Sequence, residues 1–143
     1  MRQINIQGFK LLTSFEGCKL HSYKDSVGVW TIGYGHTGHD VGPHMTIDQV
    51  KADSLLENDI SRFEVGVSDL LQIDINDNQF SALVCFSYNV GLGALKSSTL
   101  LKYVNDLMFE QAALEFPKWA KAGGKEQPGL LRRRQAEQLL FLS

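Results

Sequence analysis

The segment from Glu16 to Thr37 limits the fold more than any other part of the chain. It reads EGCKLHSYKDSVGVWTIGYGHT, with apolar and polar residues alternating loosely around an Asp-Ser-Val-Gly turn. Alternation on both sides of such a turn is typical of a β-hairpin, so we predict one over residues 19–34. The glycines that follow predict a tightly turning loop, and they are Gly33, Gly35, Gly38 and Gly42.

Helical patterns occupy most of the remaining chain. Phe9, Leu12 and Phe15 share one face of a helix predicted over residues 5–16, which Asn5 can cap and Gly17 can end. The prediction is therefore a mainly α protein of the α+β class, with a small β-hairpin near its N-terminus.

Capping patterns place the next two helices. The run Thr46–Gln49 reads as a capping box, which predicts a long helix to about Val67. Asn76 or Asp77 opens another helix to about Asn89, which is apolar nearly all round and should be central. Two or three shorter helices finish the chain, with Pro117 disturbing one and the pair at 128–129 separating the last.

Three polar residues of the hairpin region suggest chemistry. Glu16 and Asp25 are nine residues apart, and Thr31 follows six residues later. Inverting glycoside hydrolysis needs one carboxylic acid for the leaving oxygen and a second carboxylate to activate water. The plainer interpretation is a solvated glutamate, an aspartate that bonds its own turn, and a strand-forming threonine. For Asp25 the turn role and the water-holding role are compatible.

The position of Glu16 suits a general acid. A helix that ends at Gly17 places the Glu16 carboxylate at the negative end of the helix dipole, and Phe15 beside it reduces solvation. Both effects favour the protonated form that a general acid requires.

The run from Thr31 to Gly38, TIGYGHTG, resembles the hairpin of the phage-type lysozymes, the muramidase endolysins of tailed phages (glycoside hydrolase family 24 type). The resemblance continues through residues 79–91, 98–102 and 129–143. It implies a single lysozyme-like catalytic domain over residues 1–143. It also implies that a long helix joins the small hairpin lobe to a helical lobe, with the active-site cleft between the two lobes.

The same resemblance implies the roles of the site residues. Glu16 closes the first helix as the general acid, Asp25 lies in the hairpin turn, and Thr31 lies on the returning strand. One arginine of the segment 132–134 should reach the glutamate, and we assign Arg133, which would oppose the helix-end effect on Glu16. His36 should pair with a carboxylate of its own lobe rather than act as a base.

Composition limits the partners. The chain has 143 residues, 43% hydrophobic and 21% charged, which predicts a folded domain. Its net charge of −2 gives no general attraction to nucleic acid, to membranes or to an anionic cell wall. An enzyme of the cell wall would therefore need a local basic patch or would bind mainly through a sugar groove. The possible groove residues are Tyr34, Gly35, Asn105, Phe109 and Trp119.

Further expectations concern metals, redox state and location. The histidines lack metal-ligand spacing, so we expect no metal and no cofactor. Cys18 and Cys85 should be reduced. Residues 1–15 lack an apolar run for a signal peptide or a spanning helix, which predicts synthesis in the host cytoplasm without stable membrane insertion. We also expect a monomer. The resemblance implies release by a phage holin and action in the periplasm of a Gram-negative host.

The predicted function is hydrolysis of the β-1,4 bond between N-acetylmuramic acid and N-acetylglucosamine in peptidoglycan, for host cell lysis. The nearest alternative is a lytic transglycosylase on the same bond, which needs the acid but no water-holding aspartate. A second alternative is an inactive peptidoglycan-binding module. Asp25 argues against the transglycosylase, and the presence of Glu16, Asp25 and Thr31 together argues against the binding module.

Overall fold

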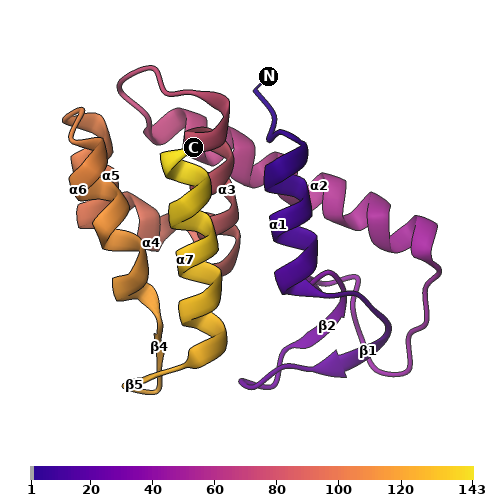
Figure 1. Cartoon of the computed structure of the whole chain (residues 1–143). Helices are drawn as coiled ribbons and strands as arrows, with labels where there is room; N and C mark the ends of the chain where they lie inside the picture. The colour runs from indigo at the N-terminus through magenta and orange to yellow at the C-terminus, as the bar shows by residue number, and fades with distance from the viewer. Residues whose placement is uncertain (1) are drawn as a thin grey trace. The chain divides into compact units, whose positions relative to one another are not determined.

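The computed structural model describes residues 2–143, which divide into two compact units. One unit comprises residues 12–62 and contains a small sheet, and the other comprises residues 2–11 and 63–143 and is mostly helical. The boundaries between the units fall within α1 (Ile6–Glu16) and α2 (Gln49–Leu70). The prediction of a mainly α protein with a small β-hairpin is confirmed (Figure 1).

Helix α1 begins and ends where the sequence predicts. The side chain of Asn5 accepts a hydrogen bond from the Gly8 N–H at 2.9 Å, and Gly17 follows the helix with a φ of 65°. The predicted apolar face is buried only at Leu12, whereas Phe9 and Phe15 are 41% and 38% exposed. The close contact of this helix is made at Gly8 instead, where an added Cβ would lie 2.6 Å from the Cβ of Ser81.

The predicted hairpin is present and belongs to a larger sheet. Strands β1 (Lys19–Lys24) and β2 (Trp30–Gly33) are antiparallel, with Tyr23 opposite Thr31. A third strand, β3 (His36–Thr37), pairs with β2 where we had predicted only a loop. The core beneath the sheet consists of Ile32, Val41 and Leu55, with Trp30, Met45 and Ile47 packed against it.

The start of α2 corrects a prediction. Thr46 does not cap the helix, because it forms an isolated bridge with His21 and its hydroxyl lies 2.9 Å from the His21 ring. The Ile47 N–H bonds the Leu20 carbonyl, so the chain is still extended at this point. Asp48 takes over the cap by accepting a hydrogen bond from the Lys51 N–H at 2.8 Å.

Helix α3 (Asp77–Val90) is the centre of the helical unit, as predicted. Asn76 and Gln79 form a complete capping box, in which each side chain accepts a hydrogen bond from the other residue's N–H. All eight residues from Phe80 to Ser87 are buried, so this helix has no solvent-facing stripe over two turns. Helix α7 (Pro128–Leu142) packs beside it (Figure 1).

Short elements connect α3 to α7. They are α4 (Leu92–Ser97), α5 (Thr99–Asn105), α6 (Phe109–Glu115), the 3₁₀ turn η1 (Phe116–Trp119), β4 (Lys121–Ala122) and β5 (Lys125–Glu126). The hairpin formed by β4 and β5 was not predicted. Pro117 lies within η1, and Pro128 is the first residue of α7 rather than a separator, because proline is favoured in the first turn of a helix.

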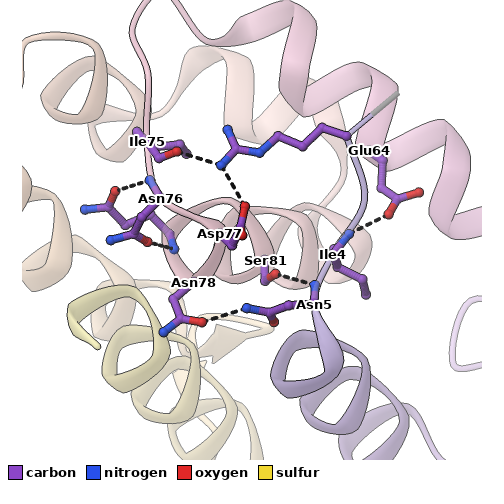
Figure 2. A network of polar contacts seen from close by, with 10 residues as sticks. Ile4, Asn5, Glu64, Ile75, Asn76, Asp77, Asn78 and Ser81 are labelled. Atoms are coloured by element: carbon purple, nitrogen blue, oxygen red, sulfur yellow. Dashed lines mark hydrogen bonds and ion pairs between the residues drawn. The ribbon is translucent and has the colours of Figure 1, made fainter.

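Polar contacts hold the segment before α1 against the helical unit (Figure 2). The Ile4 N–H donates to the buried carboxylate of Glu64 at 2.7 Å, and the Asn5 N–H donates to the Ser81 hydroxyl at 3.0 Å. Arg2 donates to the Ile75 carbonyl at 2.6 Å. The first turn of α1 is therefore fixed by side chains of α2 and α3.

Candidate active site

Asp25 and Thr31 are held by the backbone of one residue. The Val29 N–H donates a hydrogen bond to Asp25 Oδ1 at 2.8 Å, and the Val29 carbonyl accepts one from Thr31 Oγ1 at 2.9 Å. Asp25 Oδ1 also accepts from the Val27 N–H at 3.0 Å, and Gly28 completes the turn with a φ of 85°. The turn role expected for Asp25 is therefore real, and it orients the carboxylate.

This arrangement leaves hydrogen-bonding capacity for a ligand. Within residues 2–143, no group donates a hydrogen bond to the second oxygen of Asp25, Oδ2. The Thr31 hydroxyl has used its proton on Val29, so it can only accept a further hydrogen bond. Thr31 is 4% exposed, which fixes its position. Each of the two side chains can therefore still accept a hydrogen bond from a ligand or a water molecule.

Glu16 is the last residue of α1 and is half-buried. Its Oε1 atom would lie 3.0 Å from a Cβ added at Gly35, whose φ of 82° turns the chain between β2 and β3. The carboxylate therefore lies against the backbone of the same sheet that holds Thr31. All three predicted catalytic residues belong to the unit of residues 12–62.

Tyr23 is a site residue that the sequence analysis missed. Burial raises the pKa of the Tyr23 hydroxyl, and the negative charges of Glu16 and Asp25 raise it further. The tyrosine is therefore neutral at pH 7 and lies in the electric field of both carboxylates. The signal that could have found it is spacing, because Tyr23 lies two residues before the turn residue Asp25, on the strand that leads into the turn, and Tyr23 pairs directly with Thr31.

His36 pairs with carboxylates of its own unit, as predicted. Its Nδ1 lies 2.7 Å from Asp59 Oδ2, and its Nε2 lies 2.9 Å from Asp40 Oδ2. Burial lowers the pKa of His36, but the hydrogen bonds with Asp59 and Asp40 outweigh burial and raise it above its usual value. The hydrogen bond from His36 also lowers the pKa of Asp40. Arg62 contacts the other oxygen of Asp59 at 3.3 Å.

This ion pair predicts how stability depends on pH. A raised folded-state pKa means that His36 stabilises the fold fully below its unfolded pKa of about 6.5, and that this contribution is lost as pH rises through the folded value. Asp40, whose pKa is lowered in the folded state, stabilises the fold above about pH 4, and this stabilisation is lost as the pH falls below that value. We expect His36→Asn to lower the unfolding free energy by roughly 1.5–3 kcal/mol at pH 5.5. The difference from wild type should shrink at pH 8.5.

Urea unfolding of both proteins at the two pH values measures this difference. His39→Asn is the control, because His39 is an exposed histidine three residues after His36. A difference that grows between pH 5.5 and 8.5 would contradict the charged pairing.

The predicted basic cluster is divided between the surface and the interior. Arg132 is exposed, whereas Arg133 and Arg134 are buried and both contact Glu137, with Nε to carboxylate distances of 3.1 and 3.0 Å. Arg133 also donates to the Cys85 carbonyl at 3.0 Å. These contacts lie within the helical unit, and the pairing of Arg133 with Glu16 stays a prediction.

Three of the residues considered for a sugar groove have packing roles. Asn105 caps the end of α2, because it accepts from the Gln72 N–H at 2.9 Å and donates to the Leu70 carbonyl at 3.1 Å. Phe109 and Trp119 make edge-on contacts with the rings of Phe141 and Phe86. Phe109 and Trp119 therefore pack against other aromatic rings of the helical unit.

Two further observations concern the cysteines and the helices. Cys18 and Cys85 are both free thiols, and the buried thiol of Cys85 donates to the Gly8 carbonyl at 3.2 Å. No helix in the described part of the chain combines the length and the apolar character needed to cross a bilayer.

Comparison with known proteins gives consistent matches. Residues 13–137 match the family model described as phage lysozyme. The endolysin of Bacillus phage B103 is 51% identical over 142 residues, which cover 98% of this chain and 54% of the relative. The endolysin of Salmonella phage P22 is 40% identical over 147 residues, and the match covers 100% of both chains.

The solved structures agree with the sequence matches. The muramidase domain of SpmX from Asticaccaulis excentricus superposes with a TM-score of 0.92 at 33% identity, covering 100% of this chain and 99% of that domain. The chain spans about half the length of the Bacillus phage relatives that it matches. Some other relatives have the name SAR-endolysin.

Proposed function

This chain belongs to the phage lysozyme family, and we propose that it is a peptidoglycan hydrolase that acts as a single catalytic domain in host cell lysis. The bond cleaved is the β-1,4 linkage between N-acetylmuramic acid and N-acetylglucosamine. One observation supports this most directly. The Val29 backbone fixes the side chains of Asp25 and Thr31, and each can still accept a hydrogen bond from a ligand. Both residues belong to the unit that also contains Glu16.

The proposed reaction is a single displacement. Glu16 gives its proton to the glycosidic oxygen while the bond from that oxygen to the anomeric carbon breaks. A water molecule donates one hydrogen bond to Asp25 and one to Thr31, and its oxygen attacks the opposite face of the anomeric carbon. The proton on the Asp25 side passes to that carboxylate, and the other proton stays on the new hydroxyl group. The configuration at this carbon is inverted. Tyr23, as a neutral hydroxyl near both carboxylates, can donate a hydrogen bond to the substrate.

Asp25→Asn separates the turn role of Asp25 from its chemical role. The amide oxygen of asparagine can still accept from Val27 and Val29, so the melting temperature should stay within about 2 °C of wild type. The variant loses the negative charge that accepts the water's proton. We expect the initial rate of wall lysis to fall on the order of 10²-fold.

The control is Asp25→Ala, which should lose both the turn contacts and the rate, because alanine has no acceptor. Lysis rates and melting curves of the two variants together show whether Asp25 has a chemical role besides its role in the turn. An Asp25→Asn variant with more than half of the wild-type rate would show that Asp25 has only the turn role.

The reaction class is tested by the products. Wild type should clear suspensions of stripped Gram-negative cells or of Bacillus walls, since the relatives come from phages of both Bacillus and Salmonella. Mass analysis should give hydrated reducing sugars. Anhydro products would replace the proposal with a transglycosylase, and binding without loss of turbidity would replace it with a wall-binding module. The anomer first released, followed by NMR, should be the inverted one.

The proposal extends to location and partners. The enzyme is made in the host cytoplasm, acts as a monomer on peptidoglycan, and reaches the wall through a holin-dependent lesion. Because some relatives are named SAR-endolysins, the export route of this chain has to be tested by experiment. Expression of this chain with and without a holin, with lysis as the readout, decides it. Lysis without a holin would overturn the proposed route.

A further inference from the structure

A tight hairpin precedes α7 and has no part in the site described above. Strands β4 and β5 are joined by Gly123 and Gly124, whose φ values are 60° and 79°. Positive φ at both central residues is the requirement of a type I′ turn, whose twist matches that of the paired strands. The Gln127 N–H donates to the Ala120 carbonyl at 2.8 Å and extends the pairing toward the core. The backbone alone therefore gives this hairpin a defined shape.

A hollow of about 250 Å³ lies at the base of the hairpin. Its lining consists of Pro117, Lys118, Ala120, Lys121 and Glu126. The volume is below the roughly 300–1,000 Å³ of sites that enclose a whole small molecule, so it suits one terminal group of a larger ligand. No lining residue has an aromatic ring on which a sugar could stack.

The strand register separates the charged side chains between two faces. Lys121 is opposite Glu126, and Ala122 is opposite Lys125. Side chains that are directly opposite share a face, and neighbours along a strand point to opposite faces. Lys121 and Glu126 therefore face the hollow, whereas Lys125 is on the other side of the hairpin, in agreement with the lining.

Two charged side chains that line the hollow, Lys121 and Glu126, are free to bind a ligand. Lys118 is bonded to Glu115 at 2.5 Å, and this hydrogen bond raises the pKa of Lys118. Lys121, Lys125 and Glu126 are exposed, and none of them has an ion-pair partner in the part of the chain that the structure describes. A ligand for this hollow should therefore have one negative and one positive group close together.

We propose that the hollow between the β4–β5 hairpin and η1 binds the free end of a peptidoglycan peptide stem, with its carboxylate at Lys121 and its amine at Glu126. The proposal rests on the proposed function, because it adds a second contact with the same substrate. A stem that ends in a diamino acid and is not cross-linked has both groups. A phosphate polymer of the wall fits less well, because Glu126 would repel it.

The proposal also answers a question raised by composition. A chain with a net charge of −2 has no overall attraction to the wall, so local recognition is needed. Lys121 supplies a local positive charge without making the whole surface basic.

The test compares two variants on two substrates. Lys121→Gln and Lys125→Gln remove the same charge from opposite faces of one hairpin, so the second is a matched control. The substrates are soluble glycan fragments with their stems and the same fragments after enzymatic removal of the stems. We expect Lys121→Gln to raise KM about two- to fivefold for the stem-bearing fragments only, the range for one exposed ion pair. Lys125→Gln should leave KM unchanged for both substrates.

Equal effects of the two variants would overturn the proposal, because they would indicate long-range charge alone. Equal effects of Lys121→Gln on both substrates would overturn it as well. A wild type that hydrolyses neither substrate would contradict the proposed function, and the binding experiment below then decides the present inference by itself.

Binding is measured by NMR on the full chain, with the amides of Gly123 and Gly124 as reporters. A soluble stem tripeptide ending in a diamino acid should shift these signals in wild type and in Lys125→Gln, and should bind about two- to fivefold more weakly to Lys121→Gln. Glu126→Gln should weaken binding of the tripeptide and strengthen binding of inorganic phosphate. Phosphate binding as strong as tripeptide binding in wild type would overturn the choice of ligand, and no shift with either would overturn the site.

Discussion

Glu16→Gln is expected to lower the initial rate of wall lysis by a factor on the order of 10²–10⁴, because the amide has no acidic proton for the glycosidic oxygen. The substitution keeps the size and shape of the side chain. Glu16 is half-buried at the end of α1, against Gly35, so the isosteric amide fits the same space. We therefore expect the loss to appear in the rate and not in the amount of folded protein.

The control for this variant is Glu57→Gln, which removes the same charge from an exposed position on α2. It should lyse cell walls at the wild-type rate. Circular dichroism spectra and melting curves of both variants show whether the fold is intact. A folded Glu16→Gln protein that retains more than a tenth of the wild-type rate would exclude Glu16 as the general acid.

Glu137→Gln is expected to have the largest effect on stability. Glu137 is fully buried, and its carboxylate contacts the guanidinium groups of Arg133 and Arg134. Arg134 also donates to the Asn89 side chain at 2.6 Å and lies over the ring of Phe86. The amide would leave two buried positive charges without their shared counter-charge. Removal of one partner of a buried ion pair costs about 3–5 kcal/mol.

A loss of this size should lower the melting temperature on the order of 10–20 °C. The control is Gln135→Ala on the exposed side of α7, which should stay within about 0.5 kcal/mol of wild type. Urea unfolding gives the free energies directly. If Glu137→Gln unfolds at the wild-type urea concentration, the carboxylate does not neutralise these arginines.

Two similar capping patterns had opposite outcomes, and the difference is physical. Asn76, one of the two residues predicted to open its helix, does so and forms a capping box with Gln79 of the same helix. At Thr46 the hydroxyl has a partner on a distant strand, His21, and the local pattern gives way to that tertiary contact. A capping pattern is therefore reliable only where no other strand pairs with the capping residue.

The predicted parts of the candidate site are those set by local chain geometry. Glu16 follows from a helix end and Asp25 from a turn, and both features are visible as neighbouring residues in the sequence. The pairing of Tyr23 with Thr31 depends on the strand register, which the sequence does not fix. The contacts of Glu137 with Arg133 and Arg134 follow from their spacing on one helix, but the sequence does not show that all three side chains are buried. The hairpin of β4 and β5 was missed because each strand has only two residues, which is too short to show alternation.

The bonds of Val29 have a consequence for how this site can evolve. The side chain of Val29 is 43% exposed and contributes nothing to the two bonds, because both come from its main chain. Selection can therefore allow many residue types at this position while excluding proline, which lacks the N–H that Asp25 requires. Variation at position 29 would then say little about its importance. Exchange of its amide hydrogen with solvent would report how often the hydrogen bond to Asp25 opens.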